Sequence, residues 1–264
     1  MQKTKSSPAL FLIGITPSHT VLGNKACVQG IELQSTSLKD VQAWFVQIDA
    51  SDFQGSKGQA NLQNIDWLSP RILAHQQAID VLMARGPCFP AGFGSLFSSI
   101  ETLTDTLHRH RDILLEYFSY VGTRREWCLK LYSSRANSPD ENSTTMPVPK
   151  SGSNYLAEKR RQKLLKDQKP IFVHDLCRKM QNEIQQMGFP IIQRPLLSIH
   201  QNDSDRPLYA NFALLLDEAQ IEQARACADS VSSEGPIQTQ IELSGPLAPY
   251  SFCPSLASQT TGAA

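Results

Sequence analysis

The second half of the chain alternates between two hydrophobic periodicities in an order that few folds can accommodate. Apolar runs typical of strands begin near residues 126, 189, 208 and 237, and amphipathic helical patterns lie between them. The order is therefore β-α-β-β-α-β, the split β-α-β pattern of ferredoxin-like folds. Right-handed crossovers would place both helices on one face of a four-stranded antiparallel sheet.

The first half follows a variant of the same theme. Three strands are predicted, at residues 9–15, 26–33 and 41–48, and residues 51–61 form a loop rich in Gly, Ser and Gln. A helix begins at Ser69 as N-cap, with Pro70 in the first helical position. Its apolar stripe consists of Ile72, Ile79, Leu82 and Met83. A longer amphipathic helix starts at Ser99 and stops at Gly122.

These patterns predict an α+β protein of two domains, each a ferredoxin-like or modified ferredoxin-like antiparallel sheet with helices on one face. The N-terminal domain spans residues 1–123 and the C-terminal domain residues 124–253, while the small, polar residues 254–264 form a disordered tail. Residues 133–152 read as a mobile loop. The helix that follows runs to about Asp167, and Pro170 restarts or kinks it.

The composition excludes several classes of function. The chain has 264 residues with 25 basic and 25 acidic side chains, so no overall field favours nucleic acid or an anionic membrane. The longest apolar run, residues 9–15, is far shorter than the roughly 20 residues that span a bilayer. The six cysteines are scattered without a Cys-x-x-Cys pair, as expected of single buried thiols in a reducing cytoplasm.

No catalytic, cofactor or metal site is predicted. The stretch GPCFPAGFGSLF at residues 86–97 is not a dinucleotide-binding G-x-G-x-x-G motif, because Phe97 occupies the last glycine position and a helix precedes it. A nucleophile elbow is absent as well. The histidines lack ligand spacing, so His75 and His110, on apolar helix faces, are interpreted as core or interface residues.

Residues 86–97 are better explained as an irregular strand. Phe89, Phe93 and Phe97 recur every four residues, which places all three on one face of an extended chain as a core stripe. Gly92 and Gly94 leave the backbone bare, which permits close approach by another element. We therefore expect Gly94→Val to damage folding.

Several short blocks follow one another in order along nearly the whole chain. They are Trp67-x-x-Pro70-Arg71, His75, Ile79-Asp80, Met83-Ala84-Arg85-Gly86, Phe89-Pro90-x-x-Phe93-Gly94-x-x-Phe97, Glu126-Trp127-x-Leu129-Lys130, Gly152-x-x-Tyr155-Leu156-x-x-Lys159 and Leu243-Ser244-Gly245-Pro246-x-x-Pro249-Tyr250-Ser251-Phe252. Together they resemble the gas vesicle protein GvpF/GvpL family. Two positions depart from the family pattern: Gly92 replaces a basic residue, and Leu247-Ala248 replaces Trp-Pro.

The resemblance implies a non-enzymatic accessory or minor structural component of gas vesicles, the hollow protein shells that give aquatic microbes buoyancy. It implies binding to the main shell protein and to other vesicle accessory proteins, in the cytoplasm, with no cofactor, nucleic acid or membrane. It also implies two α+β domains. The candidate interaction residues are Arg71, His75, Arg85, Pro90, Phe93, Gly94, Trp127, Tyr155, Lys159, Pro246 and Tyr250.

Two other function classes stay open on sequence grounds. Trp67, Arg71, His75, Arg85 and Glu126 could line an interdomain cleft of a small-molecule-binding or enzymatic module. The plainer interpretation is that the two arginines form ion pairs that tie a helix to the sheet. Nucleic-acid binding has less support, because no aromatic residues interleave the basic run at residues 159–163, which suits a solvated helix face.

Overall fold

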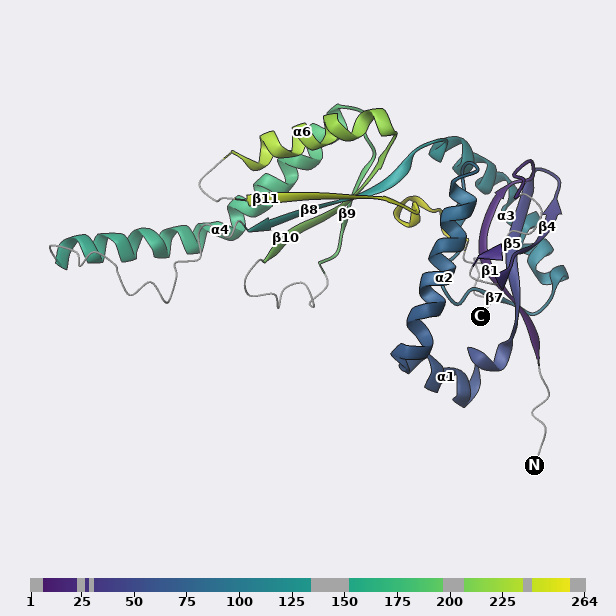
Figure 1. The fold of residues 1–264 in the computed structure, drawn as a ribbon. Helices are drawn as coiled ribbons and strands as arrows, with labels where there is room; N and C mark the ends of the chain where they lie inside the picture. Colours follow the sequence, from purple (N-terminus) through teal and green to yellow (C-terminus); the bar gives the residue numbers. More distant parts are fainter. Residues whose placement is uncertain are drawn as a thin grey trace, which may run out of the picture. The chain divides into compact units, whose positions relative to one another are not determined.

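The computed structural model describes residues 7–22, 27–28, 31–133, 152–196, 207–234 and 239–256. The chain divides into two compact units, one of residues 1–125 and 248–264 and the other of residues 126–247 (Figure 1). The expected boundary after residue 123 lies close to the first break, but residues 248–253, assigned to the second domain, return to the first unit. The mobile loop and the disordered tail predicted from the sequence lie largely outside the described residues.

The first unit is built on an antiparallel sheet with β1 (Pro8–Pro17) at its centre. On one side β1 pairs with β5 (Val41–Asp49), which in turn pairs with β4 (Gln34–Leu38). On the other side β1 pairs with two short strands, β6 (Phe89–Pro90) and β7 (Leu96–Phe97). A separate ribbon joins β2 (Cys27–Val28) to β3 (Ile31–Glu32). The strands predicted at residues 9–15 and 41–48 are therefore confirmed.

Both faces of this sheet are covered. Phe11 and Ile13 of β1 belong to a hydrophobic cluster with residues of α2 (Ile65–Met83), and the alternating Leu10 and Leu12 are equally buried. α3 (Ile100–Val121) contacts β1, β4 and β5, and Figure 1 shows the sheet between α2 and α3. The sequence pattern predicted helices on one face of each domain, an arrangement that the first unit does not have.

The loop expected at residues 51–61 is wrong, because the structure has a short 3-10 helix η1 (Ala50–Asp52) followed by α1 (Gly55–Gln63). The Gly- and Gln-rich sequence has low intrinsic helix propensity. Gly58 is buried against the backbone of Phe53, where a Cβ would lie 2.2 Å from the carbonyl carbon. Close backbone packing therefore gives this glycine a structural role inside the helix.

The two long helices of the first unit differ in how well their starts were predicted. α2 begins at Ile65 rather than at Ser69, because the Asn64 side chain accepts hydrogen bonds from the following turn, and Pro70 lies inside the helix. α3 begins after Ser99, whose Oγ accepts from the Thr102 amide at 3.3 Å in a capping box, and it ends at Gly122 as predicted.

Residues 86–97 form two short strands joined by a turn, not one strand. The Phe89 ring packs edge-on against Tyr117 of α3, whereas the Phe93 ring packs edge-on against His75 of α2. The predicted single stripe of phenylalanines is therefore wrong, because two of its members serve different helices.

The glycines of this region also change roles. Gly94 is exposed and has a φ of 90°, and a Cβ added there would have no atom within 4 Å, so Gly94 supplies a backbone conformation and not close approach. Gly14 of β1 is the glycine at a close approach. A Cβ there would lie 3.0 Å from both the Phe89 carbonyl oxygen and the Cys88 Sγ.

The second unit has the β-α-β-β-α-β order that the sequence predicts. Its elements are β8 (Arg125–Ser133), α4 (Gly152–Gln186), β9 (Ile191–Arg194), β10 (Leu208–Leu216), a 3-10 turn η3 (Glu218–Gln220), α6 (Ile221–Ser232) and β11 (Thr239–Leu247). The strands are arranged in the order β11-β8-β10-β9, so the first and third strands of the unit are central.

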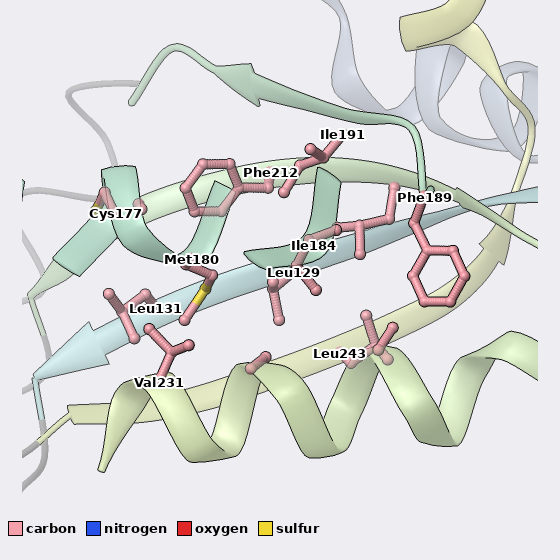
Figure 2. Packing of buried hydrophobic residues seen from close by; sticks show 14 of the residues in the cluster. Leu129, Leu131, Cys177, Met180, Ile184, Phe189, Ile191, Phe212, Val231 and Leu243 are labelled. Carbon is pink, nitrogen blue, oxygen red and sulfur yellow. The ribbon is translucent and has the colours of Figure 1, made fainter. Parts of the chain in front are cut away.

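One hydrophobic cluster joins both helices of this unit to its sheet (Figure 2). Met180 and Ile184 of α4 are fully buried between the strands and α6. The other principal members are Leu129, Leu131, Leu176, Phe189, Ile191, Phe212, Leu214, Ala224, Ala228, Val231 and Leu243.

α4 is continuous through Pro170, so the helix does not restart there, and of the two predicted alternatives only a kink remains compatible with the structure. The helix residues after Pro170 pack their apolar stripe on the sheet through Leu176, Met180 and Ile184, which stabilises that half. Figure 1 shows the preceding half of α4 extending past the end of the sheet.

Candidate interaction sites

A pocket of about 320 Å³ lies between α2 and the sheet of the first unit. The residues of α2 that line the pocket recur every three or four positions, the spacing that places side chains on one face of a helix. Arg71, Ala74, His75 and Ala78 form this α2 wall. The opposite wall comes from alternate residues of two paired strands, β1 and β5. These strand residues are Phe11, Ile13, Val46 and Ile48.

Aromatic rings close one side of this pocket. The Phe93 ring lies 5.3 Å from Phe11, 5.6 Å from His75 and 5.8 Å from Phe53, measured between ring centroids. The first two contacts are edge-to-face, the favoured geometry for aromatic pairs. Phe93 therefore belongs to the pocket because the turn between β6 and β7 directs it toward α2.

His75 is the one buried polar group in the pocket wall among the described residues. It is about 5% exposed, and its Nε2 has no hydrogen-bond partner in the described part of the chain. Burial lowers the pKa of this imidazole, and a hydrogen bond with the Leu12 backbone only partly opposes the effect. Burial therefore favours the neutral imidazole. His75 is buried, as the sequence-based interpretation as a core or interface histidine requires, but its Nε2 lacks the hydrogen bond that a buried polar atom normally makes.

The charged groups at the mouth of the pocket already have partners. The Arg71 guanidinium stacks 4.0 Å from the Trp67 ring and donates to the Trp67 carbonyl at 2.9 Å. Asp52 forms an ion pair with Lys57 at 2.7 Å, and Asp49 Oδ1 accepts from the Ser51 amide. Among the residues that the structure describes, Arg71 therefore makes no ion pair that ties α2 to the sheet, contrary to the plainer sequence interpretation.

A second group of candidates meets behind residues 86–97. The Tyr250 hydroxyl donates to the Ala91 carbonyl at 3.2 Å, and burial raises the pKa of this phenol to about 12. Pro90 is buried and pairs with Gly14 of β1. The Tyr117 hydroxyl of α3 donates to the Cys88 carbonyl at 3.1 Å. The C-terminal segment thus closes over this part of the first unit through internal hydrogen bonds.

Trp127 and Pro246 lie near each other in the second unit. A Cβ on Gly245 would lie 2.8 Å from the Trp127 ring, so the glycine allows the ring to sit against β11. Trp127 also packs against the hydrophobic cluster of this unit, whereas Pro246 is exposed. The sequence block that contains Trp127 and the block that contains Gly245 and Pro246 therefore pack against each other within the second unit.

The remaining candidates are dispersed. Arg85 and Gly94 are exposed in the first unit, while Tyr155 and Lys159 belong to α4, with side chains outside the described residues. Of the cluster expected at an interdomain cleft, Trp67, Arg71 and His75 adjoin on α2. Glu126 belongs to the second unit, where it is fully buried and ion-paired with Arg194.

Exposed apolar side chains gather on the N-terminal half of α2, a feature that the sequence pattern did not predict. Ile65, Ile72 and Ile79 recur every seven residues and share one side of the helix. Ile79 is buried as predicted, but Ile72 is 45% exposed and Ile65 is 67% exposed. Leu73, at 54%, and Leu62 at the end of α1 add to this surface. We call Leu62, Ile65, Ile72 and Leu73 the α2 apolar surface.

Ile72 was expected in the buried stripe, and this expectation is wrong because the core ends partway along the isoleucine row. The seven-residue recurrence itself was a usable signal. A helix that carries apolar residues beyond its buried stripe has more hydrophobic surface than one core can cover. Within the described part of the chain, no helix is long and apolar enough to cross a membrane, and no cluster of side chains is suited to a metal ion.

Comparison with known proteins points to one family. The family model described as gas vesicle synthesis protein GvpL/GvpF matches residues 9–254. A curated relative, gas vesicle protein L of Streptomyces sp. (strain CB03234), is 24% identical over 208 residues, which cover 78% of this chain and 77% of the relative.

Two solved structures share the fold across both units. The crystal structure of GvpF from Anabaena sp. PCC7120 has a TM-score of 0.62 at 15% identity and covers 93% of this chain and 96% of its own. That of GvpF from Microcystis aeruginosa has a TM-score of 0.60 at 14% identity and covers 92% of this chain and 98% of its own.

Proposed function

Because the chain belongs to the gas vesicle synthesis protein GvpL/GvpF family, we propose that it is an accessory or minor structural protein of gas vesicle assembly. In this role it binds the main shell protein and other vesicle proteins, acts on the vesicle within the cytoplasm, and catalyses no reaction. The family match supports a role in gas vesicles, and the choice of partners is our proposal.

The α2 apolar surface is the observation that best supports a binding role. Exposed apolar groups gathered on one element mark interaction sites more often than isolated ones do. A shell subunit must keep its apolar surface covered until it is incorporated, because exposed hydrophobic surface leads to aggregation. Complementary apolar surface on an accessory protein provides that cover. The exposed candidates Arg71, Arg85, Gly94 and Pro246 are proposed as flanking or secondary contacts.

A double variant tests this proposal. Ile72 and Leu73 are each about half exposed, so a partner can bury about half of each side chain. At ~1.5–3 kcal/mol for full burial, the two together contribute about 1.5–3 kcal/mol, or roughly 10- to 150-fold in affinity. We expect Ile72→Ser with Leu73→Ser to weaken binding of the full chain to purified shell protein by that factor.

Ile100 and Ile113 of α3 provide a matched control, because they are also isoleucines of the first unit with 45% and 36% exposure. The Ile100→Ser, Ile113→Ser protein is expected to bind like the parent. Equal weakening in both double variants would remove the α2 apolar surface from the proposal. Failure of the parent chain to bind the shell protein or any other vesicle component would refute the function.

A further inference from the structure

β9 is an edge strand of the second sheet, and a groove of about 450 Å³ lies between it and α4. In the described part of the chain, β9 pairs with β10 on one side only. We propose that this edge and groove bind an extended segment of a partner protein, which adds to β9 as a strand, inserts an apolar side chain into the groove and carries a carboxylate near Arg178. Such a site does not depend on the role in gas vesicle assembly.

The backbone groups that β9 offers follow from its pairing with β10. The register places Ile191 opposite Leu214, and the next amide, that of Leu215, donates to the Pro190 carbonyl at 3.0 Å. In an antiparallel pair, residues that hydrogen-bond to the neighbouring strand alternate with residues whose N–H and C=O groups point away from it. Since Pro190 bonds to β10, the backbone groups of Ile191 and Gln193 point to the open side. Each offers one donor and one acceptor to an added strand.

The same two residues connect the open edge to the groove. Their side chains share one face of the strand, and Ile191 packs in the hydrophobic cluster below α4 while Gln193 lines the groove. A residue opposite Gln193 in an added strand has its side chain on this face, because directly opposed residues lie on the same side of a sheet. The added strand lies about 4.8 Å farther out. Its side chain therefore enters the groove beside Val173 and Cys177 of α4.

The lining favours an apolar side chain at that position. Val173, Cys177 and Tyr209 all line the groove, and all three also belong to the hydrophobic cluster of the second unit or pack against it. The wall is thus continuous with the core, and removing an apolar side chain from water there is favourable. A volume of about 450 Å³ lies within the usual range for binding sites in proteins and accommodates a branched side chain such as that of leucine.

The charge of the groove favours an acidic neighbour for that leucine. Arg178 and His174 are among its lining residues, and none of those residues is a carboxylate. Arg178 lies 3.5 Å from Asp175, but both side chains are more than half exposed, and such pairs contribute little to stability. Arg178 can therefore attract a second carboxylate. An acidic residue two positions from the leucine shares its face of an extended strand and lies toward the groove.

Prolines on both sides of β9 limit the length of the added segment. Pro190 and Pro195 have no N–H group, so they cannot donate to a neighbouring strand. The added strand can pair fully with Ile191 and Gln193 only, which suits a short segment of a partner. The same limit disfavours a long pairing between the β9 strands of two copies of this chain.

Peptide binding to the full chain tests the proposal by NMR at low salt. The parent peptide is acetyl-Thr-Val-Thr-Leu-Thr-Asp-Thr-amide, whose leucine and aspartate share a face, and we expect saturable binding that shifts the resonances of Val173, Ile191 and Gln193. Three control peptides each change one group. Serine for leucine and N-methylation of the leucine amide should each weaken binding about tenfold, and asparagine for aspartate about two- to fivefold. Lack of saturable binding, or any control peptide binding as tightly as the parent, would overturn the proposal.

Two pairs of variants locate the peptide on the protein. Gln193→Pro removes the outward N–H without removing a bond to β10 and should abolish binding, whereas Gln193→Thr keeps the N–H and should bind like the parent chain. Gln181→Phe fills the groove from α4 and should abolish binding as well, whereas Gln185→Phe, at an exposed position outside the groove, should not. If Gln193→Pro does not fold, the second pair decides. Retained binding in a folded Gln181→Phe protein would refute the site.

A second copy of this chain is the other possible occupant of the β9 edge. Sedimentation of the parent chain and of Gln193→Pro distinguishes it from a partner segment. Monomers in both proteins support a partner segment. A parent dimer that Gln193→Pro dissociates would assign the edge to self-association and overturn the proposal.

Discussion

Gly14 and Gly94 provide a direct test of how residues 86–97 fit the first unit. At Gly14 an added Cβ would lie 3.0 Å from the Phe89 carbonyl oxygen and from Cys88 Sγ, and 3.3 Å from a Leu82 methyl carbon. The Phe89 oxygen belongs to β6 and cannot move without disturbing its pairing with β1. Inserting a methyl group into such a contact costs about 1–3 kcal/mol, and a larger side chain costs more.

At Gly94 the cost has a different origin. Nothing lies within 4 Å of a Cβ there, so packing contributes nothing, and the φ of 90° alone disfavours any other residue by about 1–2 kcal/mol. We therefore expect Gly94→Ala and Gly94→Lys to destabilise the first unit equally. Gly14→Ala and Gly14→Val should destabilise it progressively. The dependence on side-chain size, not the mean cost, distinguishes the two glycines.

Urea denaturation monitored by Trp44 fluorescence measures this difference, because Trp44 is buried in β5 directly opposite Gly14. Trp67→Phe and Trp127→Phe in every protein leave Trp44 as the only one of the three tryptophans. The change in free energy of unfolding follows from the shift in midpoint at constant slope. A steep size dependence at Gly94, or none at Gly14, would refute the assignment of close approach to Gly14.

Buried groups give three further predictions. The free energy of unfolding should fall as the pH drops below about 6.5, because the unfolded chain then protonates His75 while burial keeps the pKa of the folded protein lower. This fall is at most ~1.4 kcal/mol per pH unit. In thermal melts, His75→Phe should flatten it. Arg194→Ala should lower the free energy of unfolding by about 3–5 kcal/mol, because it deprives the buried Glu126 carboxylate of a cationic partner. Adding Glu126→Gln should recover part of that loss. If the effects of the two substitutions were fully additive in urea titrations, the pairing would be contradicted. Cys88 should react with a thiol reagent far more slowly than the partly exposed Cys227, since burial raises its pKa and blocks access, and comparable rates in the native chain would contradict the packing.

The elements that the sequence predicted correctly are those whose local signals agree with their packing. Ser99 and Gly122 delimit α3 by capping chemistry that operates within one helical turn. The β-α-β-β-α-β order of the second unit follows from periodicity alone. α1 could not be predicted because its Gly- and Gln-rich sequence has low helix propensity. The close contact between Gly58 and the Phe53 backbone, on which the helix depends, is visible only in the structure. Pro170 was expected to restart or kink the helix, and the apolar stripe that packs on the sheet after it belongs to a helix that continues through the proline.

The pocket could be predicted only in part. Arg71 and His75 were expected together in one cleft, but Phe93 lay in a separate sequence block with no indication that it joins them. Their meeting depends on the turn between β6 and β7, which directs Phe93 toward α2. The missing hydrogen bond of His75 is a matter of distances between elements, and no spacing of residues in the chain could reveal it.

The contacts of the family-like blocks also bear on where a partner can bind. Tyr250 is hydrogen-bonded to Ala91, Pro90 pairs with Gly14, and the Trp127 ring lies against Gly245. A partner that used these groups would first have to break contacts that hold each unit together. The α2 apolar surface needs no such disruption, because its side chains are already exposed. Partner binding at α2 therefore leaves the fold intact, which is why variants there should separate loss of binding from loss of stability.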